Sequence, residues 1–344
     1  MLCSSRRHPM LQLFQTLLPR LFFLSATLAL GACDGANDPL APAGADALAP
    51  AGEPTSEAVA SNNALAVITS QVIVFSSDRN GLQSDIYRMD PQGNNVTRLT
   101  YTTDHETAPA VSWDNKHIAM VRVRRDASYI QHDDIYVIDT DGSNGHWARS
   151  APYGYNLGDP SWSPDGSHLV LAVNVGGTRY LGLLHLDSGK IDAVAEGTGG
   201  VKGYQPSYDR TGQRIVYLGN GGNTVEQVNA DGSGHKTRYS TAATVPVRNP
   251  TFSPDGKKIA FDRIVGTGNN VEIFVKNLVD GSVKRLTTSA GADLQPSWSP
   301  DGSRIAFASV RSGKFKIWTM SATTGGNLVR ISNAAGDWEP EWSH

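Results

Sequence analysis

Three acidic residues stand at the same place in the sequence, three positions before a proline: Glu106, Asp293 and Asp337. Carboxylates that meet from separate segments can hold a cation, a basic peptide or the hydroxyls of a sugar, and an all-oxygen site suits Ca²⁺ or Mg²⁺ better than zinc. Other polar and aromatic residues lie beside prolines of the same kind. We predict one binding rim that comprises His105, Glu106, Asp159, Tyr204, Arg248, Asp293, Asp337, Trp338 and Glu339.

The same residues allow a second interpretation. Acidic and amide side chains are common where strands begin, where they cap backbone groups or are simply solvated. His105 is the only histidine near the predicted rim, which is few for a metal site built on imidazole ligands. No cofactor is therefore firmly implied, and Ca²⁺ or Mg²⁺ at the mouth of the rim is the metal that the pattern allows.

The prolines belong to an internal repeat. Three copies are nearly identical, at residues 160–166, 250–256 and 296–302, and read Pro-Ser/Thr-Trp/Phe-Ser-Pro-Asp-Gly. Weaker copies begin at Pro109 and Pro206, and a clipped copy begins at Pro340. The six leading prolines are 51, 46, 44, 46 and 44 residues apart. Such a period is typical of a stacked or radial array of equal structural units.

Each unit has the pattern of short antiparallel strands. Ser-Pro-Asp-Gly suits a type I turn, and alternating apolar strands follow it between turns rich in Gly, Asp and Asn. An aromatic residue two positions after most leading prolines predicts packing between units. Four strands per unit predict an all-β, six-bladed β-propeller over residues 71–344. The last unit stops after one strand, and the strands at 72–81, 84–93 and 96–100 supply its missing part, so we expect N-terminal and C-terminal strands to close the ring.

The repeat resembles that of TolB-type propellers. The residues that carry the resemblance are Pro296–Phe307, Asp85–Met89 and Arg98-Leu99-Thr100, and the similar region spans 71–344. The resemblance implies the propeller fold and a role in the cell envelope. TolB has an α/β domain before its propeller, whereas here an Ala/Pro/Gly-rich segment, 34–70, occupies that place and predicts a tether.

Similar repeats also occur in propellers that are oligogalacturonate lyases, which use a divalent metal held by histidines in the channel. That resemblance implies an alternative function, a channel-sited, metal-dependent carbohydrate-active lyase. The chain contains no Gly-x-Ser-x-Gly elbow, no phosphate-binding Gly-rich loop and no His-Glu-x-x-His motif. Whether it is an enzyme stays open, and binding is the preferred interpretation.

The first 33 residues have the pattern of an export signal. They contain three arginines and no acid, and residues 21–32 are apolar, too short a run to span a bilayer as a helix. Leu30-Gly31-Ala32-Cys33 resembles a bacterial lipobox, which implies cleavage before Cys33 and lipid attachment to it. Translation can begin at Met1 or at Met10. We predict a lipid-anchored protein that faces the periplasm, on the inner or the outer membrane.

Composition limits the partner. The 344 residues include 30 Lys and Arg against 33 Asp and Glu, for a net charge of −3, which argues against nucleic acid. Two cysteines, Cys3 and Cys33, exclude a disulfide scaffold. We therefore expect a monomeric binding platform for a periplasmic or cell-surface protein or glycan, attached to the membrane through the lipid on Cys33.

Overall fold

The structure is a computed structural model that describes residues 71–344 apart from 82, 126–130, 195–199 and 267–269. The predicted signal segment, Cys33 and the predicted tether lie outside the described residues. The described residues form 24 β-strands. Among them no helix is long and apolar enough to cross a membrane.

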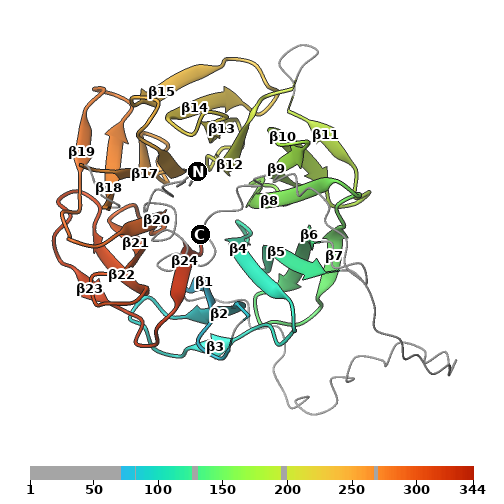
Figure 1. The fold of residues 1–344 in the computed structure, drawn as a ribbon, viewed down its shortest axis with the longest axis horizontal. Coiled ribbons are helices and arrows are strands. Elements are labelled where there is room, and N and C mark those ends of the chain that lie inside the picture. The colour runs from blue at the N-terminus through green and yellow to red at the C-terminus, as the bar shows by residue number, and fades with distance from the viewer. Residues whose placement is uncertain (1–70, 82, 126–130, 195–199, 267–269) are drawn as a thin grey trace, which may run out of the picture. The chain divides into compact units, whose positions relative to one another are not determined.

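The strands form six four-stranded antiparallel sheets, which surround one axis as the blades of a propeller (Figure 1). Blade 2 contains β4 (His105–Val111), β5 (His117–Arg125), β6 (Gln131–Asp139) and β7 (His146–Arg149). Blade 3 contains β8 (Tyr155–Trp162), β9 (His168–Val175), β10 (Thr178–His185) and β11 (Ile191–Ala193). Blade 4 contains β12 (Gly203–Tyr208), β13 (Arg214–Gly219), β14 (Thr224–Asn229) and β15 (Lys236–Ser240).

Blade 5 contains β16 (Val247–Phe252), β17 (Lys258–Ile264), β18 (Val271–Asn277) and β19 (Val283–Arg285). Blade 6 contains β20 (Asp293–Trp298), β21 (Arg304–Ser309), β22 (Lys316–Ser321) and β23 (Val329–Arg330). Blade 1 contains β24 (Asp337–Trp342), β1 (Ile73–Ser77), β2 (Asp85–Met89) and β3 (Thr97–Arg98). The first-named strand of each blade is the innermost one (Figure 1).

Blade 1 joins the two ends of the described chain, as the repeat predicts. Ile73 pairs with Trp342 and Ser77 with Asp337 in an antiparallel ladder between β1 and β24. The Ser343 N–H donates to the Val72 carbonyl at 2.9 Å, which extends the ladder beyond Trp342. The prediction that N-terminal and C-terminal strands share one blade is confirmed.

The Ser-Pro-Asp-Gly turns also form as predicted. In blade 3, Gly166 has a φ of +72° and its N–H donates to the Ser163 carbonyl at 2.9 Å. The Ser163 hydroxyl donates to Asp165 at 2.6 Å, and the same carboxylate accepts the Ser167 N–H. Where the glycine is replaced, in blade 2, Asn115 takes the left-handed conformation with a φ of +60°.

The repeated aromatic residues pack between blades. Trp162, Tyr208, Phe252, Trp298 and Trp342 are 3–6% exposed. Trp342 of blade 1 shares an apolar cluster with Ala306 and Ile317 of blade 6. Burial of one large ring at each of these places ties neighbouring sheets together, so the ring of blades behaves as one core.

Removing the Trp342 side chain, which packs where the propeller closes, should destabilise the fold. We expect Trp342→Ala to lower the free energy of unfolding by about 3–5 kcal/mol, because it empties a packed site between blades 1 and 6. Urea unfolding followed by circular dichroism measures the change. Tyr153→Ala is the control, since Tyr153 is 78% exposed and its loss should change stability by about 0.5 kcal/mol or less. Equal effects of the two substitutions would contradict the packing role.

Candidate functional site at the hub

Every innermost strand carries a β-bulge at its leading proline. The ladder with the next strand shifts register there in all six blades. The residue before the proline has a φ between +50° and +57°, which is uncommon outside glycine. We call these six bulge residues the belt: Ala108, Asp159, Gln205, Asn249, Gln295 and Glu339.

Hydrogen bonds run around the belt from blade to blade. In four places a belt N–H, displaced from its ladder by the bulge, donates to the side chain of the belt residue in the preceding blade. The donor and acceptor pairs are Gln205 N to Asp159 Oδ2 at 3.2 Å, Asn249 N to Gln205 Oε1 at 2.9 Å, Glu339 N to Gln295 Oε1 at 3.0 Å and Ala108 N to Glu339 Oε2 at 2.7 Å. The polar belt residues therefore stabilise the ring.

Two places depart from this pattern. The Gln295 N–H donates to Asp262 Oδ2 at 3.0 Å, and the same oxygen accepts the Asn249 amide at 2.6 Å. Between blades 2 and 3, Ala108 has no side-chain oxygen to offer the N–H of Asp159. The belt is therefore open at this one interface.

Carboxylates at the hub are poorly solvated. Burial raises the pKa of Glu339, and the negative charge of Asp159 adds to that rise. Burial also raises the pKa of Asp159, although Arg179 and the Gln205 N–H oppose the rise. Two residues beyond Glu339 along β24, burial raises the pKa of Glu341 to about 7. The hydrogen bond that the Ser297 hydroxyl donates to this carboxylate offsets the rise only in part.

A second layer lies two residues before each proline. We call it the hub mouth; it consists of Thr107, Gly158, Tyr204, Arg248, Leu294 and Trp338, each paired with the equivalent residue of its second strand. Tyr204, Arg248 and Trp338 are half-buried. The Arg179 guanidinium lies 4.4 Å from the centre of the Tyr204 ring, and Arg248 Nε lies 3.2 Å from Asp262 Oδ1.

Five of the nine predicted rim residues thus lie around the axis, in the belt or the mouth. The five are Asp159, Tyr204, Arg248, Trp338 and Glu339. The Trp338 side chain also hydrogen-bonds to Glu339, which connects the two layers. His105 is half-buried at the start of β4, where its Nδ1 accepts the Ser84 N–H at 3.2 Å.

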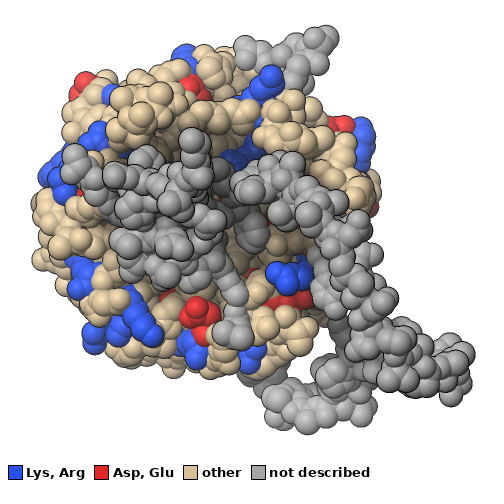
Figure 2. Space-filling model, viewed as in Figure 1, with Lys and Arg blue, Asp and Glu red and all other residues tan. Residues whose placement is uncertain are grey.

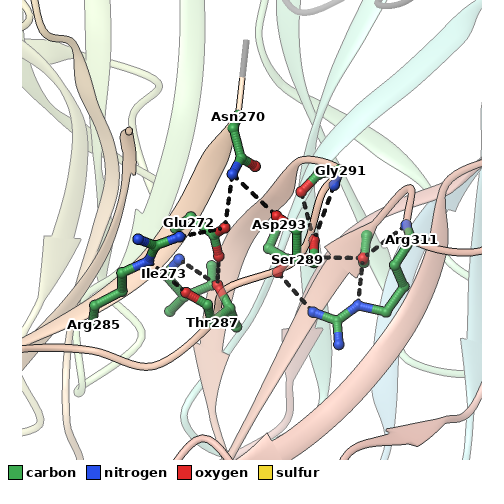
Figure 3. A network of polar contacts seen from close by, with 10 residues as sticks. Asn270, Glu272, Ile273, Arg285, Thr287, Ser289, Gly291, Asp293 and Arg311 are labelled. Carbon is green, nitrogen blue, oxygen red and sulfur yellow. Dashed lines mark hydrogen bonds and ion pairs between the residues drawn. The ribbon is translucent and has the colours of Figure 1, made fainter. Parts of the chain in front are cut away.

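The other three acids do not form a shared site. Each is fully buried against an arginine of its own blade: Arg122 Nε lies 3.0 Å from Glu106, Arg311 Nη2 lies 2.6 Å from Asp293, and Arg79 Nη2 lies 2.7 Å from Asp337. Figure 3 shows Asp293 with Arg311 and, in the neighbouring blade, Glu272 with Arg285. These three buried carboxylates therefore face their own arginines rather than one another, and Asp337 Oδ2 is the one oxygen among them that is buried without a hydrogen-bond partner in the described part of the chain.

The oxygen-rich metal site considered from the sequence does not fit this arrangement. Its three carboxylates are each held by a guanidinium, and no three His, Cys, Asp or Glu side chains among the described residues are placed to hold a metal ion. Burial raises the pKa of Glu106 to about 7 even though Arg122 and Thr102 oppose the rise. That acid is therefore partly protonated near neutral pH, which further weakens it as a ligand.

Sequence reasoning missed several hub residues. The repeat places Gln205, Asn249 and Gln295 at the same offset from their prolines as Asp159 and Glu339, but the predicted rim included only the latter two. Arg179 and Asp262 lie on other strands, and nothing in the repeat marks them. On the face drawn in Figure 2, Lys and Arg are interspersed with Asp and Glu where grey atoms do not cover it.

The arrangement defines a six-bladed β-propeller with a polar hub. Residues 233–344 match the family model described as the TolB beta propeller domain. The fold is similar to that of TolB from Acinetobacter baumannii, at 20% identity and a TM-score of 0.67 over 80% of this chain and 67% of that chain. A putative TolB from Agrobacterium tumefaciens is 18% identical, with a TM-score of 0.59 over 78% of this chain and 91% of that one.

An oligogalacturonate lyase in complex with manganese has the same fold more distantly. It is 14% identical, with a TM-score of 0.53 over 76% of this chain and 74% of that chain. No curated protein sequence matches the chain. The comparisons thus show a propeller fold similar to that of TolB, and the C-terminal residues 233–344 match the TolB propeller model.

The half-buried acid Glu341 on β24 makes stability depend on pH. The pKa of Glu341 is about 7 in the folded chain and 4.5 ordinarily, so its favourable contribution is complete below about pH 4.5 and is lost as the pH rises through about 7. Glu341→Gln should leave stability unchanged at pH 4 and raise it at pH 9. Because one pKa unit corresponds to about 1.4 kcal/mol and the site is half-buried, we expect a gain of about 1–3 kcal/mol. Urea unfolding at both pH values measures it.

Asp165→Asn is the control, and its effect on stability should have the opposite sign to that of Glu341→Gln. Hydrogen bonds from Ser163 and Ser167 lower the pKa of Asp165 to about 2, so its contribution is present above the ordinary value of 3.8 and is lost as the pH falls through about 2. This variant should be less stable than the wild type at pH 7. A Glu341→Gln variant that gains nothing at pH 9 would contradict the desolvated state of Glu341.

Proposed function

We propose that this chain is an envelope lipoprotein, anchored through a lipid on Cys33, whose propeller is a platform for a partner protein on the periplasmic side. The observation that carries the proposal is the hub mouth. Tyr204, Arg248 and Trp338 come from three blades, lie half-buried at one end of the hub, and stand over the belt carboxylates Asp159 and Glu339. Aromatic and arginine side chains that retain an exposed part are the ones that dominate binding at protein interfaces.

The direction in which the chain enters the propeller supports this orientation. Gln71 accepts a hydrogen bond from the Trp342 indole at 3.3 Å, at the end of β24 away from the mouth residue Trp338. A flexible tether of residues 34–70 would have an average span of about 35 Å. The described chain therefore begins at the end of the hub away from the mouth, which is compatible with a partner at the mouth.

Loss of the anchoring cysteine tests the membrane half of the proposal. Cys33→Ser should abolish incorporation of radiolabelled palmitate, release the protein from membranes, and leave the signal uncleaved by the lipoprotein peptidase. Cell fractionation, labelling and intact mass measure these effects. Cys3→Ser is the matched control and should behave as the wild type. Palmitate labelling that survives Cys33→Ser would overturn the anchor.

A photo-cross-linker at the mouth tests the platform half. We expect p-benzoylphenylalanine in place of Trp338 to give one protein adduct in the native envelope, and the same reagent in place of Val279, which is 76% exposed on the β18–β19 turn, to give none. Gly158→Trp should abolish the adduct, because nothing lies within 4 Å of a Cβ at Gly158 and the added ring would fill the mouth. Val279→Trp is its control.

The outcomes of that experiment separate the alternatives. An adduct that Gly158→Trp removes and Val279→Trp leaves supports a partner at the mouth, provided that both variants melt at the wild-type temperature. Absence of an adduct from Trp338, or an adduct that persists in Gly158→Trp, would overturn the platform. An adduct to glycan alone would identify a saccharide in place of a protein.

A further inference from the structure

One position of the repeat is aromatic in most blades. The position lies on the third strand of each blade. In blade 1 it is Tyr87, which pairs with Phe75 of the second strand, and the other blades have equivalent pairs. We call it the plug position. Its occupants in blades 1 to 6 are Tyr87, Tyr136, Gly182, Glu226, Phe274 and Trp318.

Each aromatic plug is covered by an arginine. The guanidinium carbon lies 4.6 Å from the ring centre of Tyr87, 3.5 Å from Tyr136, 4.2 Å from Phe274 and 5.1 Å from Trp318, and the cations are Arg79, Arg122, Arg263 and Arg311. The rings also pack on the preceding blade, as Tyr87 does on Ile317 of blade 6. A ring with a cation over it therefore fills the outer part of these blade interfaces.

Blade 3 has no ring at this position, and aliphatic side chains lie over it instead: Val173 Cγ2 and Ile191 Cγ2 lie 2.7 and 2.8 Å from an ideal Cβ at Gly182. Gly182 occupies its plug position and pairs across the sheet with Ala193, where blade 2 has Tyr136 paired with Trp147. A groove of about 680 Å³ lies there between blades 2 and 3, a size typical of ligand sites. The buried Leu157 lines the groove. Gly182 and Ala193 line it too, and neither has an aromatic side chain. We call this groove the slot.

Blade 4 shows that loss of an aromatic plug does not by itself create a groove. Its plug position holds Glu226, but the neighbouring Tyr217 is 1% exposed and its ring occupies the place where a side chain of Gly203 would lie, 2.4 Å from an ideal Cβ. In blade 3, Leu171 stands where blade 4 has Tyr217. Blade 3 therefore has an aromatic ring at neither position, and the smaller side chains of Leu171, Val173 and Ile191 pack there.

One arginine that lines the slot has a buried nitrogen without a hydrogen-bond acceptor in the described part of the chain. Arg149, from the end of β7 in blade 2, lines the slot, and its Nε is buried without a hydrogen-bond partner among the described residues. Two aromatic residues, Tyr155 and Tyr180, also line the slot. A buried donor without a partner is unfavourable, so an acceptor brought by a ligand would be favoured.

The outer edge of blade 3 lies beside the slot. β11 is the last strand of its sheet, and Ala193, which lines the slot, belongs to it. A strand edge offers backbone groups to an extended peptide, which can then place one side chain in an adjacent pocket. The predicted tether, residues 34–70, contains no Phe, Tyr or Trp and cannot supply a ring itself.

From these observations we propose that the slot binds an aromatic side chain of a partner polypeptide, next to an acidic residue that pairs with Arg149. The inserted ring lies in the groove against Val173 and Ile191, which cover Gly182, and Arg149 supplies a cation as the arginines of the other blades do. The proposal rests on the proposed function, since it assigns a second contact of the same platform to a partner protein.

Fluorescence anisotropy with labelled peptides tests the slot in the full-length chain. The probes are Asp-Trp-Asp and Asp-Ala-Asp, each acetylated or labelled at one end and amidated at the other. We expect Asp-Trp-Asp to bind at least tenfold more tightly than Asp-Ala-Asp. Ala193→Trp should weaken Asp-Trp-Asp at least tenfold, because it places a ring over Gly182 from an exposed position. Thr237→Trp, the equivalent exposed position of blade 4, is the control and should change nothing.

Arg149→Met tests the cation separately. It should weaken Asp-Trp-Asp at least threefold and leave Ser-Trp-Ser, which lacks the carboxylates, less affected. The proposal is overturned if the Trp and Ala peptides bind alike, if no saturation is seen up to about 5 mM peptide, or if Ala193→Trp has no effect. Competition by trigalacturonate with no binding of peptide would overturn it in favour of a saccharide.

The two proposals can fail independently. If Gly158→Trp abolishes the Trp338 adduct in cells while the slot variants bind peptide as the wild type does, the platform stands and the slot proposal fails. If Asp-Trp-Asp binds in the slot and no adduct forms from Trp338, the slot is a peptide site and the platform at the mouth fails.

Discussion

The pairing of β24 with β1 is the constraint on which the rest of the propeller depends. A ring of sheets that is left open exposes two blade faces and two strand edges, whereas this pairing buries both. It also completes the hub. The belt bond from Ala108 to Glu339 and the ion pair from Arg79 to Asp337 both join residues more than 200 positions apart, and neither can form until β24 is in place. The mouth residue Trp338 is carried on the same strand.

The six blades repeat one pattern of residues, so a blade interface that departs from the pattern is a candidate for a specific function. The interface between blades 2 and 3 has two omissions: Ala108 offers no acceptor to the belt, and Gly182 offers no ring to the plug position. The interface is held in another way. The Trp162 indole donates to the Ala110 carbonyl at 2.9 Å, and the Trp113 indole donates to the Trp162 carbonyl at 3.1 Å. Firm inner contacts therefore permit an open outer groove.

The sequence was sufficient to predict the fold and part of the hub. A proline, an aromatic residue and a Ser-Pro-Asp-Gly turn recur at fixed offsets, and each has a local physical reason, so blade number, ring closure and the place of Asp159 and Glu339 could be predicted. The fate of Glu106, Asp293 and Asp337 could not. Their environment is set by arginines on neighbouring segments, and whether a guanidinium reaches a carboxylate depends on ladder register and burial rather than on spacing. The slot depends on Gly182, which has no side chain to draw attention in a sequence.

Among the described residues, some carboxylates on the innermost strands have an arginine partner and others have none. This difference affects which groups the mouth can bind. Asp293 and Asp337, the first residues of β20 and β24, are each paired with a half-buried arginine, as Asp337 is with Arg79. Glu339 and Glu341 have no such partner, and burial raises the pKa of both. A desolvated carboxylate without a counter-charge favours its protonated form, and a cationic group that approaches it favours the ionised form. In the platform that we propose, a basic side chain of the partner at the mouth would thus gain more from Glu339 than from Asp293 or Asp337, which already have an arginine partner.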